Sequence, residues 1–208
     1  RFTGNAELRL HAPEDDVRVP GDLDRDGYDD LLILPSKPGD VCVVSSQSGK
    51  TLASLSMDAG LSPSTLIQCS ATIHDMDGDG ELDVVLGMPE WKHCGGILAF
   101  RRGENQVIGA HEIVRSDVRS DESLPSGYGV RVIDLPDRRT LIVIGMDDFL
   151  FPAIRAYADL EGTVLWETSV EEVLVGIGQR LEIFDFGDEI TVVPDQDGDG
   201  VADLLTGT

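Results

Sequence analysis

The amino-acid sequence predicts an all-β protein, a β-propeller built from four-stranded blades. Three observations support this prediction: short unbroken apolar runs, turn residues between them, and an Asp-rich motif that recurs along the chain. The 208 residues include 23 Gly and 10 Pro, spread throughout, which is typical of many short strands joined by tight turns. Four antiparallel strands in each repeat of about 50 to 60 residues are the pattern of a propeller blade.

Each repeat is expected to contain four strands in the same order. The first strand precedes the Asp-rich motif, at residues 17–19, 66–73 and 130–133. The second is an unbroken apolar run, which favours burial on both faces of the strand, at residues 31–34, 84–86, 141–144 and 204–205. The third lies at residues 40–44, 96–100 and 153–157, and the fourth at residues 51–55, 107–110 and 163–166. Polar turns separate these last two strands, and a short helix is possible only at residues 169–174.

The spacing of the Asp-rich motif indicates the domain organisation. Its copies begin at Asp22, Asp75 and Asp195, and the second interval is about twice the first. A fourth copy is therefore expected near Asp134, where the apolar frame surrounds a shorter turn without the other ligands, and we interpret it as a degenerate repeat without metal. Residues 1–208 are predicted to be one propeller domain or fragment, with repeats at approximately 13–60, 61–115, 125–170 and 171–208. About three and a half blades favour a fragment of a larger propeller, since closure needs roughly four or more; an irregular fourth blade is the alternative.

The motif reads D-x-D-x-D-G-x-x-D and predicts a calcium site in each of three loops. Calcium is a hard cation that takes roughly six to eight oxygen ligands at flexible angles. Carboxylates at positions 1, 3 and 5 converge from one tight loop, and Gly at position 6 permits the sharp turn that aims the backbone carbonyl of position 7 inward. The Asp at position 9 closes the shell. The predicted ligands, with carbonyls from the seventh positions, are Asp22, Asp24, Asp26, Tyr28 and Asp30; Asp75, Asp77, Asp79, Glu81 and Asp83; and Asp195, Asp197, Asp199, Val201 and Asp203.

Zinc, magnesium and an EF-hand all suit the motif less well than a calcium loop between strands. Zinc favours His or Cys, which these positions lack, and magnesium demands a near-octahedral shell with retained waters. An EF-hand loop needs an acidic ligand at position 12, which is Ile33, Leu86 or Thr206 here, and flanking helices, which Pro20 and Pro194 oppose. Simple Asp-Gly turns would leave several like charges close together without a neutralising cation.

Composition excludes some classes of partner. The formal net charge is -23, which argues against nucleic acid and against anionic membrane surfaces and favours cations. No apolar run approaches the roughly 18 residues of a membrane helix, so we expect no membrane insertion in this segment. No signal peptide is visible, although a leader preceding Arg1 is compatible with the sequence. The cysteines, Cys42, Cys69 and Cys94, are odd in number, so one disulfide with a free thiol and three buried thiols both stay open.

These features resemble the FG-GAP repeats of integrin α-subunit propellers and their bacterial relatives. The "FG" part is similar to Gly127-Tyr128-Gly129-Val130, and the "GAP" part to Gly87-Met88-Pro89 and, more loosely, to Gly145-Met146-Asp147. The first repeat has Leu34-Pro35-Ser36 at that place. The resemblance implies a calcium loop between the first and second strands of each blade, and a rigid extracellular or cell-surface module whose propeller face binds its ligand.

The resulting functional hypothesis is a non-enzymatic, calcium-binding module for adhesion, recognition or assembly. It implies three Ca²⁺ ions, a protein or glycan ligand on the propeller face, and possible self-association. No catalytic residue is assigned. One alternative is a propeller-scaffold enzyme acting on polysaccharide, a lyase or hydrolase, which would need His, Arg, Tyr or Glu side chains converging at the propeller face. A purely structural subunit of a surface layer or filament is another, because fold alone does not determine function.

Overall fold

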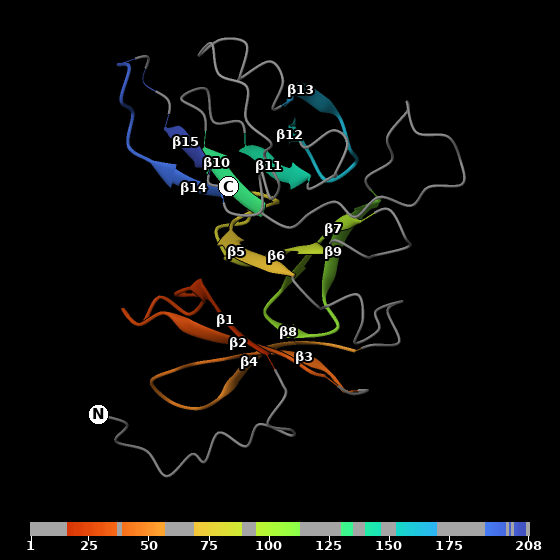
Figure 1. Cartoon of the computed structure of the whole chain (residues 1–208). Coiled ribbons are helices and arrows are strands. Elements are labelled where there is room, and N and C mark those ends of the chain that lie inside the picture. The colour runs from red at the N-terminus through yellow and green to blue at the C-terminus, as the bar shows by residue number, and fades with distance from the viewer. Residues whose placement is uncertain are drawn as a thin grey trace.

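The computed structural model describes residues 16–36, 39–56, 69–88, 95–112, 130–134, 140–146, 153–169, 190–198, 200 and 202–206. Every regular element in these ranges is a β-strand, so the predicted all-β class is confirmed for the described part of the chain (Figure 1). No helix there is long and apolar enough to cross a membrane. Most of the possible helix at residues 169–174 lies outside the described residues.

The first sheet contains the expected four antiparallel strands in chain order: β1 (Asp16–Gly21), β2 (Asp30–Leu34), β3 (Val41–Val44) and β4 (Thr51–Leu55). A fifth strand, β8 (Gly103–Glu104), pairs with β4 in parallel. The sequence predicted only a polar turn at this place. The turn reaches back to the preceding sheet and links the first two repeats.

The next two sheets repeat this order. The second sheet contains β5 (Ser70–His74), β6 (Asp83–Met88), β7 (Gly96–Arg101) and β9 (Val107–Glu112). The third contains β10 (Val130–Asp134), β11 (Thr140–Met146), β12 (Ala153–Tyr157) and β13 (Val164–Ser169). A final antiparallel pair is formed by β14 (Ile190–Val193) and β15 (Asp203–Thr206). The predicted strand positions are therefore confirmed wherever the chain is described.

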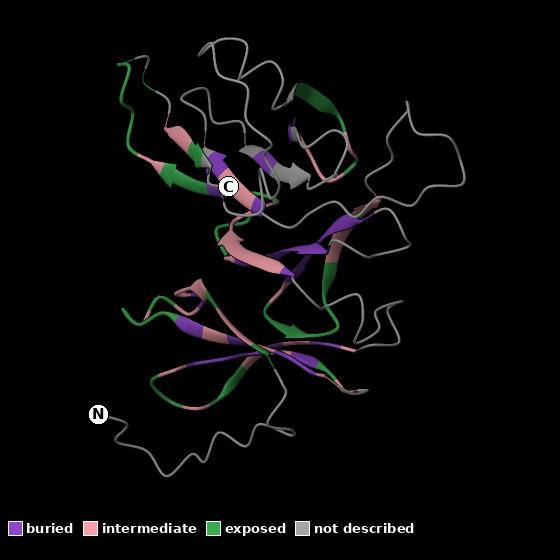
Figure 2. Ribbon diagram, viewed as in Figure 1, coloured by how far each residue is buried: buried purple, intermediate pink, exposed green. Residues whose placement is uncertain are grey.

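The sheets bury their apolar residues against one another. Alternate residues of β6 and β7 point to opposite faces: Leu86 and Phe100 pack with the first sheet, whereas Val85 and Ile97 pack with the third. All six residues of β6 are buried, which explains its unbroken apolar sequence (Figure 2). In β2 the pattern alternates, because no described sheet covers its other face. The expectation of two buried faces thus holds for the second sheet and not for the first.

The first strands of successive sheets lie next to one another. β1 contacts β5, β5 contacts β10, and β10 contacts β14. The backbone N–H of Val130 donates to the Ser70 hydroxyl at 2.9 Å and joins two of these strands directly. Figure 1 shows the sheets following one another from the N-terminal sheet at the bottom to the C-terminal pair at the top. This arrangement brings the β1–β2, β5–β6 and β14–β15 connections to equivalent positions in their sheets.

The cysteines in the described part of the chain are free thiols. Cys42 is half-buried, and Cys69 is buried in the core between the first and second sheets. Burial raises the pKa of the Cys69 thiol to about 12, so it behaves as an unreactive apolar residue. Cys94 lies outside the described residues.

Candidate metal centres

The three Asp-rich loops connect the first and second strands of their sheets, as predicted. In each loop the carboxylates of positions 1, 3 and 9 come together, with one oxygen from each residue lying within 4.8 Å of the others. These groups are Asp22, Asp24 and Asp30; Asp75, Asp77 and Asp83; and Asp195, Asp197 and Asp203. An all-carboxylate oxygen set of this kind suits a hard cation. The corresponding turn after Asp134, residues 135–139, lies outside the described residues.

The Asp at position 9 is fixed by the backbone of position 2. The N–H of Leu23 donates to Asp30 Oδ2 at 2.8 Å, and the N–H of Met76 donates to Asp83 Oδ2 at 2.9 Å. Asp203 accepts the same bond in the third loop. Asp30 and Asp83 are both fully buried, and burial raises the pKa of each carboxyl. Burying a carboxylate is unfavourable unless a positive charge compensates it.

The Asp at position 1 folds the loop around its side chain. In the second loop, Asp75 Oδ1 accepts from the Gly78 N–H at 2.8 Å and Oδ2 from the Gly80 N–H at 2.9 Å. The third loop repeats both bonds with Asp195. Positions 4 and 6 take positive φ in all three loops, as at Gly78 with 75° and Gly80 with 89°. Glycine adopts this conformation without steric cost, which explains its place in the motif.

The Asp at position 5 also accepts a hydrogen bond from the loop backbone. Asp26 Oδ1 accepts from the Tyr28 N–H at 2.9 Å, and Asp79 Oδ1 accepts from the Glu81 N–H at 2.8 Å. Neither Asp belongs to the converging groups of three. The Tyr28 and Glu81 side chains are exposed, which is compatible with a role for their carbonyls alone. Asp199 and Val201 lie outside the described residues.

The second loop contains a direct sign that the site suits a cation. Asp83 Oδ1 is buried and has no hydrogen-bond partner among the described residues. A buried carboxylate oxygen left unpaired is costly, and a metal ion bound by Asp75, Asp77 and Asp83 would satisfy it. The residues present therefore fit a hard divalent cation such as calcium.

Two arginines contact the second loop, and the motif gave no indication of either. Arg101, the last residue of β7, pairs with Asp77 and Asp79 through its two terminal nitrogens. Arg25, at position 4 of the first loop, donates to the Gly80 carbonyl at 2.9 Å. Arg101 reaches this loop through the strand register, which places it directly opposite Asp83 across β6 and β7.

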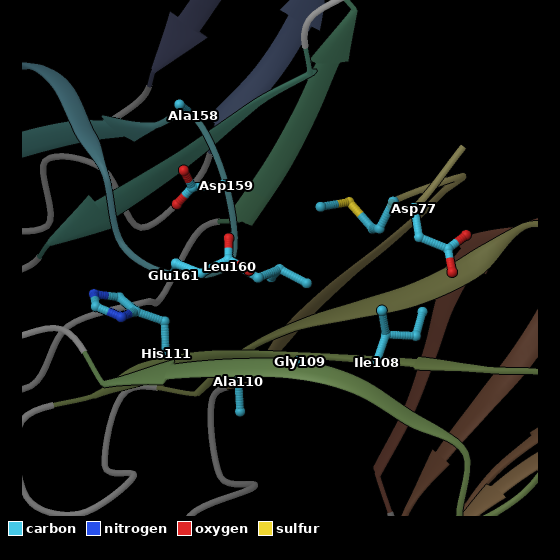
Figure 3. A pocket seen from close by; sticks show the side chains of 10 residues that line it. Asp77, Ile108, Gly109, Ala110, His111, Ala158, Asp159, Leu160 and Glu161 are labelled. Atoms are coloured by element: carbon cyan, nitrogen blue, oxygen red, sulfur yellow. The ribbon is translucent and has the colours of Figure 1, made fainter. Parts of the chain in front are cut away.

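A cavity of about 370 Å³ lies between the second and third sheets, beside the second loop. Figure 3 shows His111 of β9 facing the Asp159–Glu161 turn, with Asp77 on the opposite side. The His111 ring packs edge-on against Tyr157, with centroids 5.4 Å apart. Burial lowers the pKa of His111. Its ring sits against Gly162, where an added Cβ would come within 1.9 Å of the imidazole, so this turn requires glycine.

Next to this cavity, Arg155 pairs with Glu167 and donates to the Tyr157 hydroxyl at 3.4 Å. No motif in the sequence indicated this convergence of His, Tyr, Arg and Glu side chains. Tyr157 is 1% exposed and Arg155 8% exposed. Glu167 is exposed, so the group lies partly in the packing of the third sheet and reaches the surface through this carboxylate.

Comparisons with known proteins agree with the architecture. Residues 22–86 match the model of the FG-GAP-like repeat, the repeat family that the sequence resembled. The chain is similar in structure to the rhamnogalacturonan lyase PL11 of Bacillus licheniformis, with TM-score 0.56 and 18% identity over 93% of this chain and 39% of that one. No curated protein matches it in sequence.

Two further solved structures are similar. One is rhamnogalacturonan lyase YesW, with TM-score 0.53 and 16% identity over 93% of this chain and 40% of that one. The other is exotype rhamnogalacturonan lyase YesX, with TM-score 0.51 and 17% identity over 93% and 38%. The chain thus spans about two fifths of each of these proteins. At this level of identity the similarity shows a shared propeller-like, all-β fold and nothing about activity.

Proposed function

We propose that this chain forms blades of a calcium-binding β-propeller, with three structural Ca²⁺ sites, and serves as a non-enzymatic extracellular module for recognition, adhesion or assembly. The main support for calcium is the recurrence of the same three carboxylates, at motif positions 1, 3 and 9, in the same connection of three sheets. The ions would supply positive charge to buried Asp30 and Asp83. The proposed role in extracellular recognition, adhesion or assembly is supported by the FG-GAP-like repeat at residues 22–86.

A fragment of a larger propeller is part of this proposal. Three sheets have four strands in chain order, and the last has a single described pair, β14–β15. The fragment hypothesis is supported by the lengths of the similar structures, of which this chain spans about two fifths. The ligand would then bind a face to which other blades also contribute.

Thermal unfolding with calcium or with excess EDTA tests the calcium sites. Calcium at about 100 times its dissociation constant stabilises by roughly 2.7 kcal/mol for each site. For a chain of this size, about 1 kcal/mol corresponds to roughly 2–4 °C. We expect EDTA to lower the melting temperature by at least about 5 °C, and re-added calcium to restore it. Equal melting temperatures in both conditions would reject the proposal.

A second candidate is a segment of a polysaccharide lyase, favoured by the three structural neighbours, all of which are rhamnogalacturonan lyases. Lyases break a glycosidic bond by elimination and leave an unsaturated sugar that absorbs ultraviolet light. Incubating this chain with rhamnogalacturonan and following absorbance separates the candidates. An increase that calcium-loaded chain produces and heat-denatured chain does not would favour the lyase. Binding without an increase would favour a carbohydrate-recognition role for this chain itself.

The purely structural alternative predicts self-association. Light scattering with and without calcium would show large assemblies for a filament or surface-layer subunit. A constant monomeric size in both conditions would favour the recognition module. The test is informative because the outer strand β13 exposes Val164, Leu165 and Trp166 in the described part of the chain.

A further inference from the structure

We propose that Arg101 is a built-in counter-ion of the second loop, which lowers the calcium affinity of this site and partly neutralises the loop while calcium is absent. The inference rests on the proposed calcium sites and assigns a function to a residue outside the motif. It makes the three sites unequal, although the motif is the same in all of them.

The contacts of Arg101 place its charge on the cation ligands. Its Nη1 lies 3.1 Å from Asp79 Oδ2, and its Nη2 pairs with Asp77 Oδ2. Asp77 is one of the three residues whose oxygens converge in this loop. The guanidinium is therefore paired with a carboxylate, that of Asp77, which an incoming ion would also bind. The hydrogen bond to Asp77 raises the pKa of Arg101, so the side chain is charged under all ordinary conditions.

The first loop has no such residue in the described part of the chain. The register of β2 and β3 places Leu31 opposite Val44, so the residue facing Asp30 is Ser45, whereas Arg101 faces Asp83 in the second sheet. Asp30 Oδ1 accepts from the backbone N–H of Ser46 at 3.3 Å instead. The first loop thus satisfies its buried carboxylate with neutral N–H groups, and the second loop holds a full positive charge beside its carboxylates.

Electrostatics determines the direction of the effect. A unit positive charge a few ångströms from a divalent ion opposes binding, and near the surface that repulsion is worth up to about tenfold in affinity after solvent screening. The Arg101 side chain is 35% exposed, so it has access to water and can move away when an ion enters. When the side chain moves away, its ion pairs with Asp77 and Asp79 are lost. This loss also lowers the calcium affinity, as the charge repulsion does.

The test needs a signal that reports on the second loop alone. Glu81 is exposed and occupies position 7, so Glu81→Trp would place an indole beside this site to sensitise Tb³⁺ luminescence, with calcium then measured by competition. Three chains are compared: E81W, E81W/R101Q and E81W/R102Q. Arg102 is the matched control, because it is next in sequence and lies 4.0 Å from Glu81 rather than on the converging carboxylates. The wild-type chain, excited at the same wavelength, gives the background to subtract.

We expect E81W/R101Q to bind calcium at this site roughly three- to tenfold more tightly than E81W, and E81W/R102Q to differ from E81W by less than about twofold. An unchanged or weaker affinity in E81W/R101Q would overturn the proposal, and so would an equal gain in the Arg102 control. If Arg101→Gln prevents folding, Arg101→Met is used, which removes the charge and keeps an apolar stem of similar length. An affinity of E81W/R101M equal to or below that of E81W would then overturn it.

Calcium titration calorimetry of the wild-type chain separates this inference from the proposed function. Calcium binding by the wild-type chain, together with no change in E81W/R101Q, would reject the role of Arg101 and leave the calcium sites intact. An absence of calcium binding by the wild-type chain would reject both.

Discussion

The first and second loops have the same motif but satisfy their buried carboxylates in different ways. Asp30 accepts a backbone N–H at each oxygen, from Leu23 and from Ser46. Asp83 accepts one, from Met76, and its other oxygen has no partner among the described residues. The motif therefore determines the shape of the loop, whereas the residues packed around it determine how strongly each site depends on a cation.

The largest expected difference between the loops appears when position 9 is neutralised in calcium-free protein. Asp30→Asn replaces one acceptor oxygen by an NH₂ group that faces an N–H donor, which should cost about 1–3 kcal/mol of unfolding free energy. Asp83→Asn can direct its NH₂ group toward the unpaired side and should cost less than about 1 kcal/mol. Urea unfolding in EDTA measures both. Equal costs, or a larger cost for Asp83→Asn, would contradict this distinction between the loops.

A smaller effect is expected at position 4, where the first loop has Arg25 and the second has Gly78. Gly78 has φ of 75°, and an added Cβ would meet nothing within 4 Å, so Gly78→Ala should cost about 1 kcal/mol through backbone strain alone. Arg25, with φ of 59°, carries that strain and gains the bond to the Gly80 carbonyl. Arg25→Gly loses the bond and removes the strain, so its net change should be within about 0.5 kcal/mol. A cost of Arg25→Gly as large as that of Gly78→Ala, with both measured by urea unfolding, would show that the link between the loops outweighs the strain.

The smallest change in stability is expected at position 7. Tyr28 is 57% exposed, so Tyr28→Phe should alter the melting temperature by less than about 2 °C. The phenol beside the first site would nevertheless sensitise bound Tb³⁺, and most of the luminescence excited through tyrosine should disappear in Tyr28→Phe. A signal of unchanged intensity in Tyr28→Phe would contradict an ion bound beside Tyr28.

The sequence was sufficient to predict the strands, their order and the position of the loops, because apolar runs and turn residues are local signals. It also predicted that the carboxylates of positions 1, 3, 5 and 9 surround one ion, and the structure brings those of positions 1, 3 and 9 together. Arg101 could not be predicted, because it is distant in sequence and only the β6–β7 register places it opposite Asp83. The pairing of β8 with β4 depends on the same kind of long-range contact.

Position 5 shows a different limit of the sequence. Asp26 and Asp79 each accept the N–H two residues later through Oδ1, a role that the motif spacing did not distinguish from that of a ligand. Their role as ligands stays a prediction. The group of Arg155, Tyr157 and Glu167 was missed because its members lie on two paired strands, and no local pattern marks them as neighbours.

Calcium binding by the three Asp-rich loops underlies every proposal made for this chain, and equilibrium dialysis followed by measurement of calcium per chain tests it most directly. We expect three ions for the wild-type chain and two for Asp83→Asn, whose substitution removes a ligand from the second loop only. A wild-type chain that retains no calcium, or an Asp83→Asn chain that retains as much as the wild type, would show that these loops are not the calcium sites proposed.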